Sequence, residues 1–155
     1  MDWSQTNDSN ASNWQQRRSE DNFIQTRETG SLDEGQGGMA WELLIAAANE
    51  SQSNAWINIP HLADDNYIRE LAELWQANLN PGLKVIVEFS NEIWNTRFDQ
   101  YDETNSADFY GVVAPKLIQI RNEFAKAFGP ESDRFEVVLA GQAGRPRMIL
   151  SLIHI

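Results

Sequence analysis

The residues best suited to chemistry are Asn91 and Glu92, which directly follow an apolar segment, residues 84–90. Polar and apolar side chains alternate along this segment, which predicts a strand with one face made of Val85, Val87 and Phe89. A carboxyl group at the C-terminal end of a parallel strand lies where (β/α)8 barrels place their catalytic groups. The plainer interpretation is a half-buried strand followed by a solvated glutamate, and spacing alone does not choose between the two.

Further polar and aromatic side chains stand at or near other predicted strand ends. His61 follows a strand predicted over residues 56–60, and Gln142 follows one predicted over residues 135–140. His61 could contact a ligand or be a partly buried histidine with satisfied hydrogen bonds. Trp3 and Trp94 have flat apolar faces that suit stacking on a ring or filling a core, whereas Trp41 and Trp75 lie on predicted helix faces and are expected in the core.

Helices are predicted between these strands. A helix over residues 40–49 precedes the first strand, a second begins after the N-cap Asp64, and a third covers residues 112–128 with Pro115 in its first turn. Residues 4–38 and 96–111 are expected to be polar loops. The alternation of helices and strands is typical of right-handed βαβ units and therefore predicts an α/β fold with a parallel sheet.

The two faces of the predicted strands differ in polarity. Asn58, Glu88 and Ser90 interrupt one face, while the other stays apolar. In an open doubly wound sheet both faces are buried, so its strands read as continuous apolar runs. A barrel with helices outside and a partly polar interior fits the pattern better, and we favour it over the open sheet.

Composition excludes several classes of partner. The chain has 155 residues and a formal net charge of −11, which argues against nucleic acid and anionic membranes. It has no cysteine. The run from His61 to Asp65 lacks a second histidine and uses Asp64 as a helix cap, so we expect no metal. The glycines of residues 35–38 do not follow a strand, so no phosphate-binding loop or other cofactor site is expected.

Four stretches taken together resemble a group of bacterial glycosidase-like (β/α)8 proteins: Met1-Asp2-Trp3 with Thr6-Asn7, His61-Leu62-Ala63-Asp64-Asp65 after Ile59-Pro60, the run from Val87 to Asn95, and Leu139-Ala140-Gly141-Gln142. These proteins are similar to the glycoside hydrolase clan whose acid/base glutamate follows an asparagine at the end of the fourth barrel strand. The resemblance implies that Asp2-Trp3 ends the second strand and that residues 56–60, 84–90 and 135–140 are the third to fifth. Residues 1–144 would then be about four of the eight strands of a TIM barrel, and residues 145–155 a non-native or irregular tail.

The resemblance also implies a function. It predicts hydrolysis of O-glycosidic bonds in a polysaccharide by a retaining, two-carboxylate mechanism, with Glu92 as the acid/base. The nucleophile would lie on the seventh strand, outside this chain, so the chain alone is predicted to be inactive. The residues expected to contact the carbohydrate or support the site are Asp2, Trp3, His61, Glu88, Asn91, Trp94 and Gln142. For Glu88, a salt bridge in the barrel interior is favoured over a direct chemical role. The alternative is a non-catalytic carbohydrate-binding barrel; localisation and oligomeric state stay open.

Overall fold

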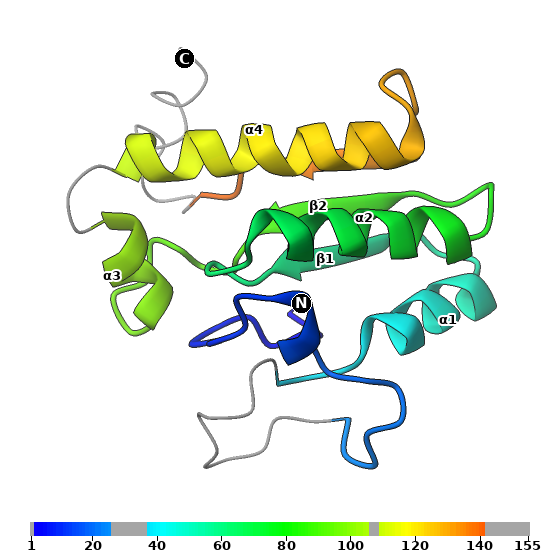
Figure 1. Ribbon diagram of the computed structural model, residues 1–155, viewed down its shortest axis with the longest axis horizontal. Coiled ribbons are helices and arrows are strands. Elements are labelled where there is room, and N and C mark those ends of the chain that lie inside the picture. The colour runs from blue at the N-terminus through cyan, green and yellow to red at the C-terminus, as the bar shows by residue number, and fades with distance from the viewer. Residues whose placement is uncertain (1, 26–36, 106–108, 142–155) are drawn as a thin grey trace.

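A computed structural model of the chain describes residues 2–25, 37–105 and 109–141 (Figure 1). Gln142 and the predicted tail, residues 145–155, lie outside these ranges. The described elements, in chain order, are a 3₁₀ turn at Trp14–Gln16, α1 (Trp41–Ser51), β1 (Ala55–Ile59), α2 (Asp65–Asn78), β2 (Val85–Phe89), α3 (Asp99–Asn105), α4 (Phe109–Phe128) and β3 (Phe135–Val138). The protein is therefore mixed α/β, as the alternating pattern predicts.

The three strands form a parallel sheet in the order β1-β2-β3. Ala55 pairs with Val85 and Ile59 with Phe89, and on the other side of β2 Val85 pairs with Phe135. Because all three strands run the same way, their C-terminal ends meet at one edge of the sheet. The described strands do not close into a barrel; within the described ranges the sheet is open.

One face of the sheet is covered by helices and holds the core. In Figure 1, α2 lies in front of the strands and α4 runs along one side of them. Helices α2 and α4 pack against each other, and α4 also contacts β2 and β3. Val85 and Val87 are fully buried on this face together with Trp75 and Phe124. The predicted core positions Trp41 and Trp75 are confirmed, since both are inaccessible to solvent.

The opposite face carries the polar side chains, and the N-terminal segment lies beside β1 (Figure 1). Asn58 and Glu88 are buried there, whereas Trp56 keeps 46% of its surface exposed. The Ser4 hydroxyl donates to the Asn58 carbonyl oxygen at 3.2 Å and so ties the N-terminal segment to β1. The contrast between an apolar, helix-covered face and a polar opposite face agrees with the sequence pattern.

Two details differ from the sequence-based expectations. Residues 96–111 are not a loop throughout, because they contain α3 and the start of α4. Since α4 begins at Phe109, Pro115 lies beyond its first turn. The chain turns directly after Asp2: the Asp2 carbonyl oxygen accepts the Gln5 N–H at 3.3 Å, and the Asp2 carboxylate accepts the Thr6 backbone N–H at 2.7 Å.

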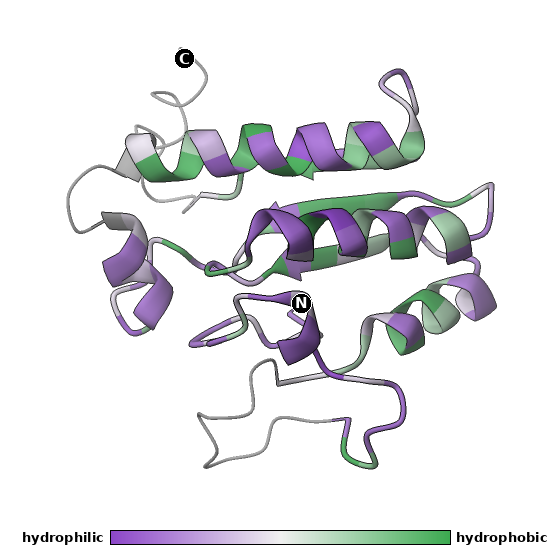
Figure 2. Cartoon of the chain, viewed as in Figure 1, coloured by the Kyte–Doolittle hydropathy of each residue, from purple (hydrophilic) through white to green (hydrophobic). Residues whose placement is uncertain are grey.

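Figure 2 shows polar residues spread along each helix, and no helix in residues 2–25, 37–105 and 109–141 is both long and apolar enough to cross a membrane. Helix α2 alternates strongly between buried residues such as Leu71 and exposed polar ones such as Gln76. It begins as predicted, with the Asp64 carboxylate accepting the Tyr67 N–H at 2.7 Å.

Gly38 is a position that only glycine suits. Its φ is +72°, and a Cβ built there would lie 2.5 Å from the Trp3 carbonyl oxygen. We expect Gly38→Ala to lower the free energy of unfolding by about 2 kcal/mol, because the substitution adds both backbone strain and a backbone clash. Gly82→Ala is the matched control, since a Cβ at Gly82 meets nothing within 4 Å. Urea unfolding measures both, and equal effects at the two glycines would contradict the prediction.

Candidate functional site

The C-terminal edge of the sheet brings together residues that follow β1 and β2. The Ser90 N–H donates to the Ile59 carbonyl oxygen at 2.8 Å, so the pairing of the two strands continues past their ends. The Asn58 side-chain amide donates to the Ser90 carbonyl oxygen at 2.7 Å. His61 and Asn91 therefore leave neighbouring strands at the same edge, as the parallel arrangement predicts.

Glu92 is held in an unusual backbone conformation. Its φ is +47°, and that of Ser90 is +56°, so left-handed residues stand on both sides of Asn91. Non-glycine residues rarely adopt this conformation, and such strain is concentrated at functional sites. The Asn95 side-chain amide donates to Glu92 Oε2 at 2.7 Å, and the Asn95 N–H donates to the Glu92 carbonyl oxygen at 2.8 Å. The half-buried carboxyl group of Glu92 is thus fixed in orientation at the edge of the sheet.

Asn91 is fixed by a buried glutamine on α3. Gln100 is fully buried; its Nε2 donates to the Asn91 carbonyl oxygen at 2.7 Å and to Asn7 Oδ1, while its Oε1 accepts the Asp8 N–H at 3.0 Å. Asn7 Oδ1 also accepts the Asn91 side-chain amide at 3.2 Å. One side chain therefore joins α3, the N-terminal turn and the segment that carries Glu92.

His61 lies at this edge of the sheet, near three acidic side chains. It is only 7% exposed, and its Nδ1 is buried with no hydrogen-bond partner in the described ranges. Burial lowers its pKa, and the negative charges of Glu103, Asp99 and Asp8 oppose that shift. The imidazole is therefore mainly neutral at neutral pH.

Asp2 and Glu88 form a second acidic group, on the polar face of the sheet. Burial raises the pKa of Glu88 most, and the nearby Asp2 carboxylate raises it further, while hydrogen bonds from Trp56 and Asn58 oppose the shift. The Trp56 indole N–H donates to Glu88 Oε2 at 2.9 Å. Burial also raises the pKa of Asp2, against the hydrogen bonds that Asp2 accepts from Thr6.

The aromatic candidates lie apart from one another. Trp94 is half-buried and packs against the core. Trp3 is 52% exposed and lines a cavity of about 420 Å³ beside α1 and the start of β1, together with Trp56 and Trp75. Gln142 falls outside the described residues. The structure therefore collects Asn91, Glu92 and His61 at one edge and places Trp3 at a different surface.

Sequence reasoning gave no role at the site to the residues that connect it. Their side chains carry its hydrogen bonds: Gln100 was not named at all, Asn58 was named only as a polar position on a strand face, and Asn7 and Asn95 only within the stretches that carry the resemblance. Asn95 could have been noticed, because it lies three residues after Glu92, the spacing of a side chain that folds back on a turn.

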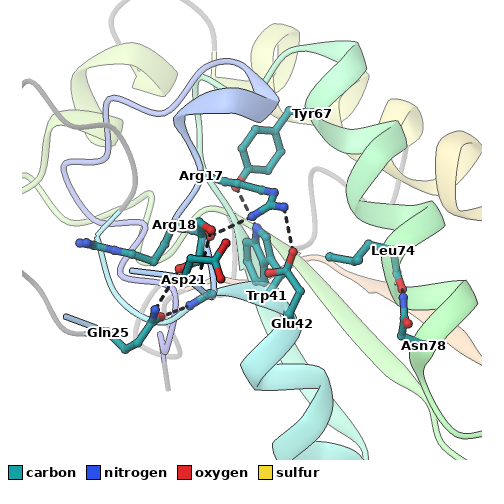
Figure 3. Close-up of polar contacts among 11 residues, drawn as sticks. Arg17, Arg18, Asp21, Gln25, Trp41, Glu42, Tyr67, Leu74 and Asn78 are labelled. Carbon is teal, nitrogen blue, oxygen red and sulfur yellow. Dashed lines mark hydrogen bonds and ion pairs between the residues drawn. The ribbon is translucent and has the colours of Figure 1, made fainter. Parts of the chain in front are cut away.

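A separate polar cluster anchors the N-terminal segment to α1 and does not reach the site (Figure 3). Arg17 forms an ion pair with Glu42 at 2.8 Å and lies over the ring of Trp14. The Trp41 indole N–H donates to the Tyr67 hydroxyl at 3.0 Å. Burial raises the pKa of Tyr67, so this phenol stays protonated as part of the core.

The raised pKa of Glu88 predicts a pH-dependent stability. The folded state binds this proton more tightly than the unfolded state, in which the pKa of Glu88 is near 4.5. The free energy of unfolding therefore falls as the pH rises from that value through the raised pKa of the folded state. Glu88→Gln keeps an oxygen to accept the Trp56 N–H and removes the ionisation. We expect its stability relative to the wild type to rise as the pH increases above about 4.5. Urea unfolding at several pH values tests this, with the exposed Glu73→Gln as control; parallel pH profiles for all three proteins would refute it.

Residues 2–25, 37–105 and 109–141 contain no group of three or more histidine, aspartate or glutamate side chains arranged to hold a metal ion. The edge of the sheet offers a fixed carboxyl group, an oriented amide and a buried neutral imidazole, which together suit a neutral polar ligand and proton transfer to or from it.

Comparison of the chain with protein-family models, with curated protein sequences and with solved structures finds no significant match to any of them.

Proposed function

We propose that this chain is part of the catalytic domain of a retaining glycoside hydrolase, with Glu92 as the acid/base. The single observation that carries the proposal is the strained, hydrogen-bonded presentation of Asn91-Glu92 at the C-terminal end of β2. Rigid presentation of a carboxyl group is what proton delivery to a leaving oxygen requires. The stretch from Val87 to Asn95 resembles barrel glycosidases, and from this resemblance we assign the carboxyl group its role as acid/base.

The proposal includes a closed (β/α)8 barrel as the complete fold, with β1, β2 and β3 as its third, fourth and fifth strands. Two features support it: the sheet is parallel, and only one of its faces is covered by the helices α2 and α4. In a barrel the polar face with Asn58 and Glu88 would line the interior. The nucleophilic carboxylate would come from a strand outside this chain, so the chain by itself is inactive in this proposal.

The other residues have supporting roles. Asn91 has its side chain fixed by Asn7 and would hydrogen-bond a sugar hydroxyl next to the reacting carbon. His61 would contact the sugar through its ring, and Glu88, on the polar face of the sheet, would support the site through the hydrogen bond that it accepts from Trp56. Trp94 would contact the sugar with the edge of its ring. Trp3 lines the cavity beside α1, at a different surface, so we assign it no role at this subsite.

Binding of neutral oligosaccharides to this chain tests the proposal. Ligand-observed NMR with a panel of soluble plant and microbial oligosaccharides should show binding that Asn91→Ala abolishes. Asn122→Ala, an exposed asparagine on α4, is the matched control and should bind as the wild type does. If no oligosaccharide of the panel binds, or if both variants behave alike, the site assignment fails.

The same edge would also serve a non-catalytic carbohydrate-binding barrel, since orienting Asn91 and His61 does not require turnover. Hydrolysis separates the two functions. A longer form of the protein that binds oligosaccharides and hydrolyses none of them would support the binding protein over the enzyme.

A further inference from the structure

Asn95 returns to Glu92 through a tight turn that the hydrophobic core anchors. The Asn95 N–H donates to the Glu92 carbonyl oxygen at 2.8 Å, which closes a four-residue turn from Glu92 to Asn95. Ile93, between them, is only 3% exposed and belongs to the core. Because this buried side chain holds the turn, the side chains at its two ends meet, and Asn95 Nδ2 lies 2.7 Å from Glu92 Oε2.

The direction of the Asn95 amide is set by its oxygen. The Arg97 N–H donates to Asn95 Oδ1 at 3.2 Å. A backbone N–H can only donate, so the amide oxygen belongs at this end and the amide nitrogen faces Glu92. The reverse orientation would place the amide nitrogen against the Arg97 N–H, two donors with no acceptor between them. Asn95 therefore presents only a donor to the carboxyl group of Glu92.

This donor decides which oxygen of a protonated Glu92 carries the proton. A protonated carboxyl group has one hydroxyl oxygen, which can donate, and one carbonyl oxygen, which only accepts. Oε2 faces the amide N–H of Asn95 and must accept, so the hydroxyl oxygen is Oε1. Within residues 2–25, 37–105 and 109–141, Oε1 has no hydrogen-bond partner, and it is not among the buried atoms that lack one. The proton is therefore held on the oxygen that reaches the solvent.

We propose that Asn95 is a positioning residue that confines the transferable proton of Glu92 to Oε1. For the destination of that proton the inference rests on the proposed glycosidase function. In the reaction, Oε1 gives its proton to the leaving oxygen, whose bond to the anomeric carbon breaks with the electron pair going to that oxygen. The nucleophilic carboxylate of the complete enzyme bonds to the same carbon, and Glu92 is left as a carboxylate. A hydrogen bond to a charged acceptor is stronger than one to a neutral acceptor, so the bond from Asn95 tightens as the proton leaves.

NMR of the 155-residue chain tests the position of the proton without any activity. In the wild type, one side-chain amide hydrogen of Asn95 should shift with pH as Glu92 titrates. It should also stay protected from exchange with water on both sides of that titration, because Oε2 accepts it in both states. The shift should disappear in Glu92→Gln, and the amide of Asn122, exposed on α4, should show neither effect. An Asn95 amide that ignores the titration, or that loses its protection when Glu92 is protonated, would overturn the proposal.

Kinetics of Asn95→Ala in a form of the protein that completes the barrel test the role in proton delivery. On the polysaccharide kcat should fall about tenfold with KM nearly unchanged, and an aryl glycoside with a strongly acidic phenol should lose less. The alkaline limb of the pH–rate profile should move to higher pH, because the ionised carboxylate loses a donor. Asn122→Ala is the matched control and should behave as the wild type does.

The two experiments separate the possible failures. A loss in Asn95→Ala that is equal at every pH and for both leaving groups would show a merely structural role and would refute the positioning role. A completed protein that hydrolyses no glycoside would defeat the proposed function instead, and the NMR titration of the 155-residue chain would still decide which oxygen of Glu92 carries the proton.

Discussion

Replacing Glu92 with glutamine in a form of the protein that completes the barrel is expected to lower turnover by about two to four orders of magnitude. The amide keeps the shape of the carboxyl group and can still accept the hydrogen bond from Asn95, which is 2.7 Å long in the wild type. It cannot deliver a proton to the leaving oxygen. Substrate binding should therefore change little, and the loss should appear in the chemical step.

The leaving group provides the sharper test. An aryl glycoside with a strongly acidic phenol needs little protonation to depart, so its glycosylation step should lose much less than that of the natural polysaccharide. Glu73→Gln, at an exposed position on α2, is the matched control and should retain full activity. Near-normal hydrolysis of both substrates by Glu92→Gln would remove Glu92 from the acid/base role. The 155-residue chain should be inactive with or without the change.

The general architecture could be predicted because burial imposes a pattern on the sequence. Val85, Val87 and Phe89 alternate along β2 and are all buried against the helices, and the helix predicted after Asp64 begins there. Local rules of this kind depend on neighbours a few residues apart. They were sufficient for the α/β class and for the parallel direction of the strands; the number of strands in the complete fold stays a prediction.

Helix α3 was missed because it does not follow the usual rule for buried helix faces. Its buried residues are Gln100 and Thr104, so it shows no apolar period. The Thr104 hydroxyl donates to the Gln100 carbonyl oxygen at 2.7 Å within the helix. A short helix that buries polar groups against other polar groups cannot be recognised from hydrophobic spacing.

The site was only half predictable for a related reason. Asn91, Glu92 and His61 could be placed at one edge, because parallel strands share their C-terminal ends. Their partners come from far along the chain: Asp8 and Gln100 are 92 residues apart, and Asn7 and Asn91 are 84 apart. Such contacts form only when the chain folds, and no residue spacing in the sequence predicts them.

Replacing Gln100 with leucine is expected to lower the free energy of unfolding by about 3 kcal/mol. Leucine is close to glutamine in size but offers no hydrogen bond, so the Asp8 N–H and the Asn91 carbonyl oxygen would lose their partner, with Gln100 itself fully buried. Buried polar groups without a partner cost far more than the hydrogen bond itself contributes. Gln76→Leu, at an exposed position on α2, is the matched control and should change the stability by less than about 0.5 kcal/mol.

Gln100→Glu separates loss of hydrogen bonding from loss of packing. Glutamate keeps the shape of the side chain and an acceptor for the Asp8 N–H, but places an oxygen against the Asn91 carbonyl oxygen, where the wild type donates at 2.7 Å. Protonating that carboxyl group restores a donor, so the stability of Gln100→Glu should recover toward acidic pH, while Gln100→Leu should show no such recovery beyond that of the wild type. The side-chain amide resonances of Asn91 should shift in both variants and stay unchanged in Gln76→Leu. If Gln100→Leu unfolds within about 0.5 kcal/mol of the wild type, Gln100 does not hold Asn91 and Glu92 in place, and the rigidity of the edge must come from the strained backbone alone.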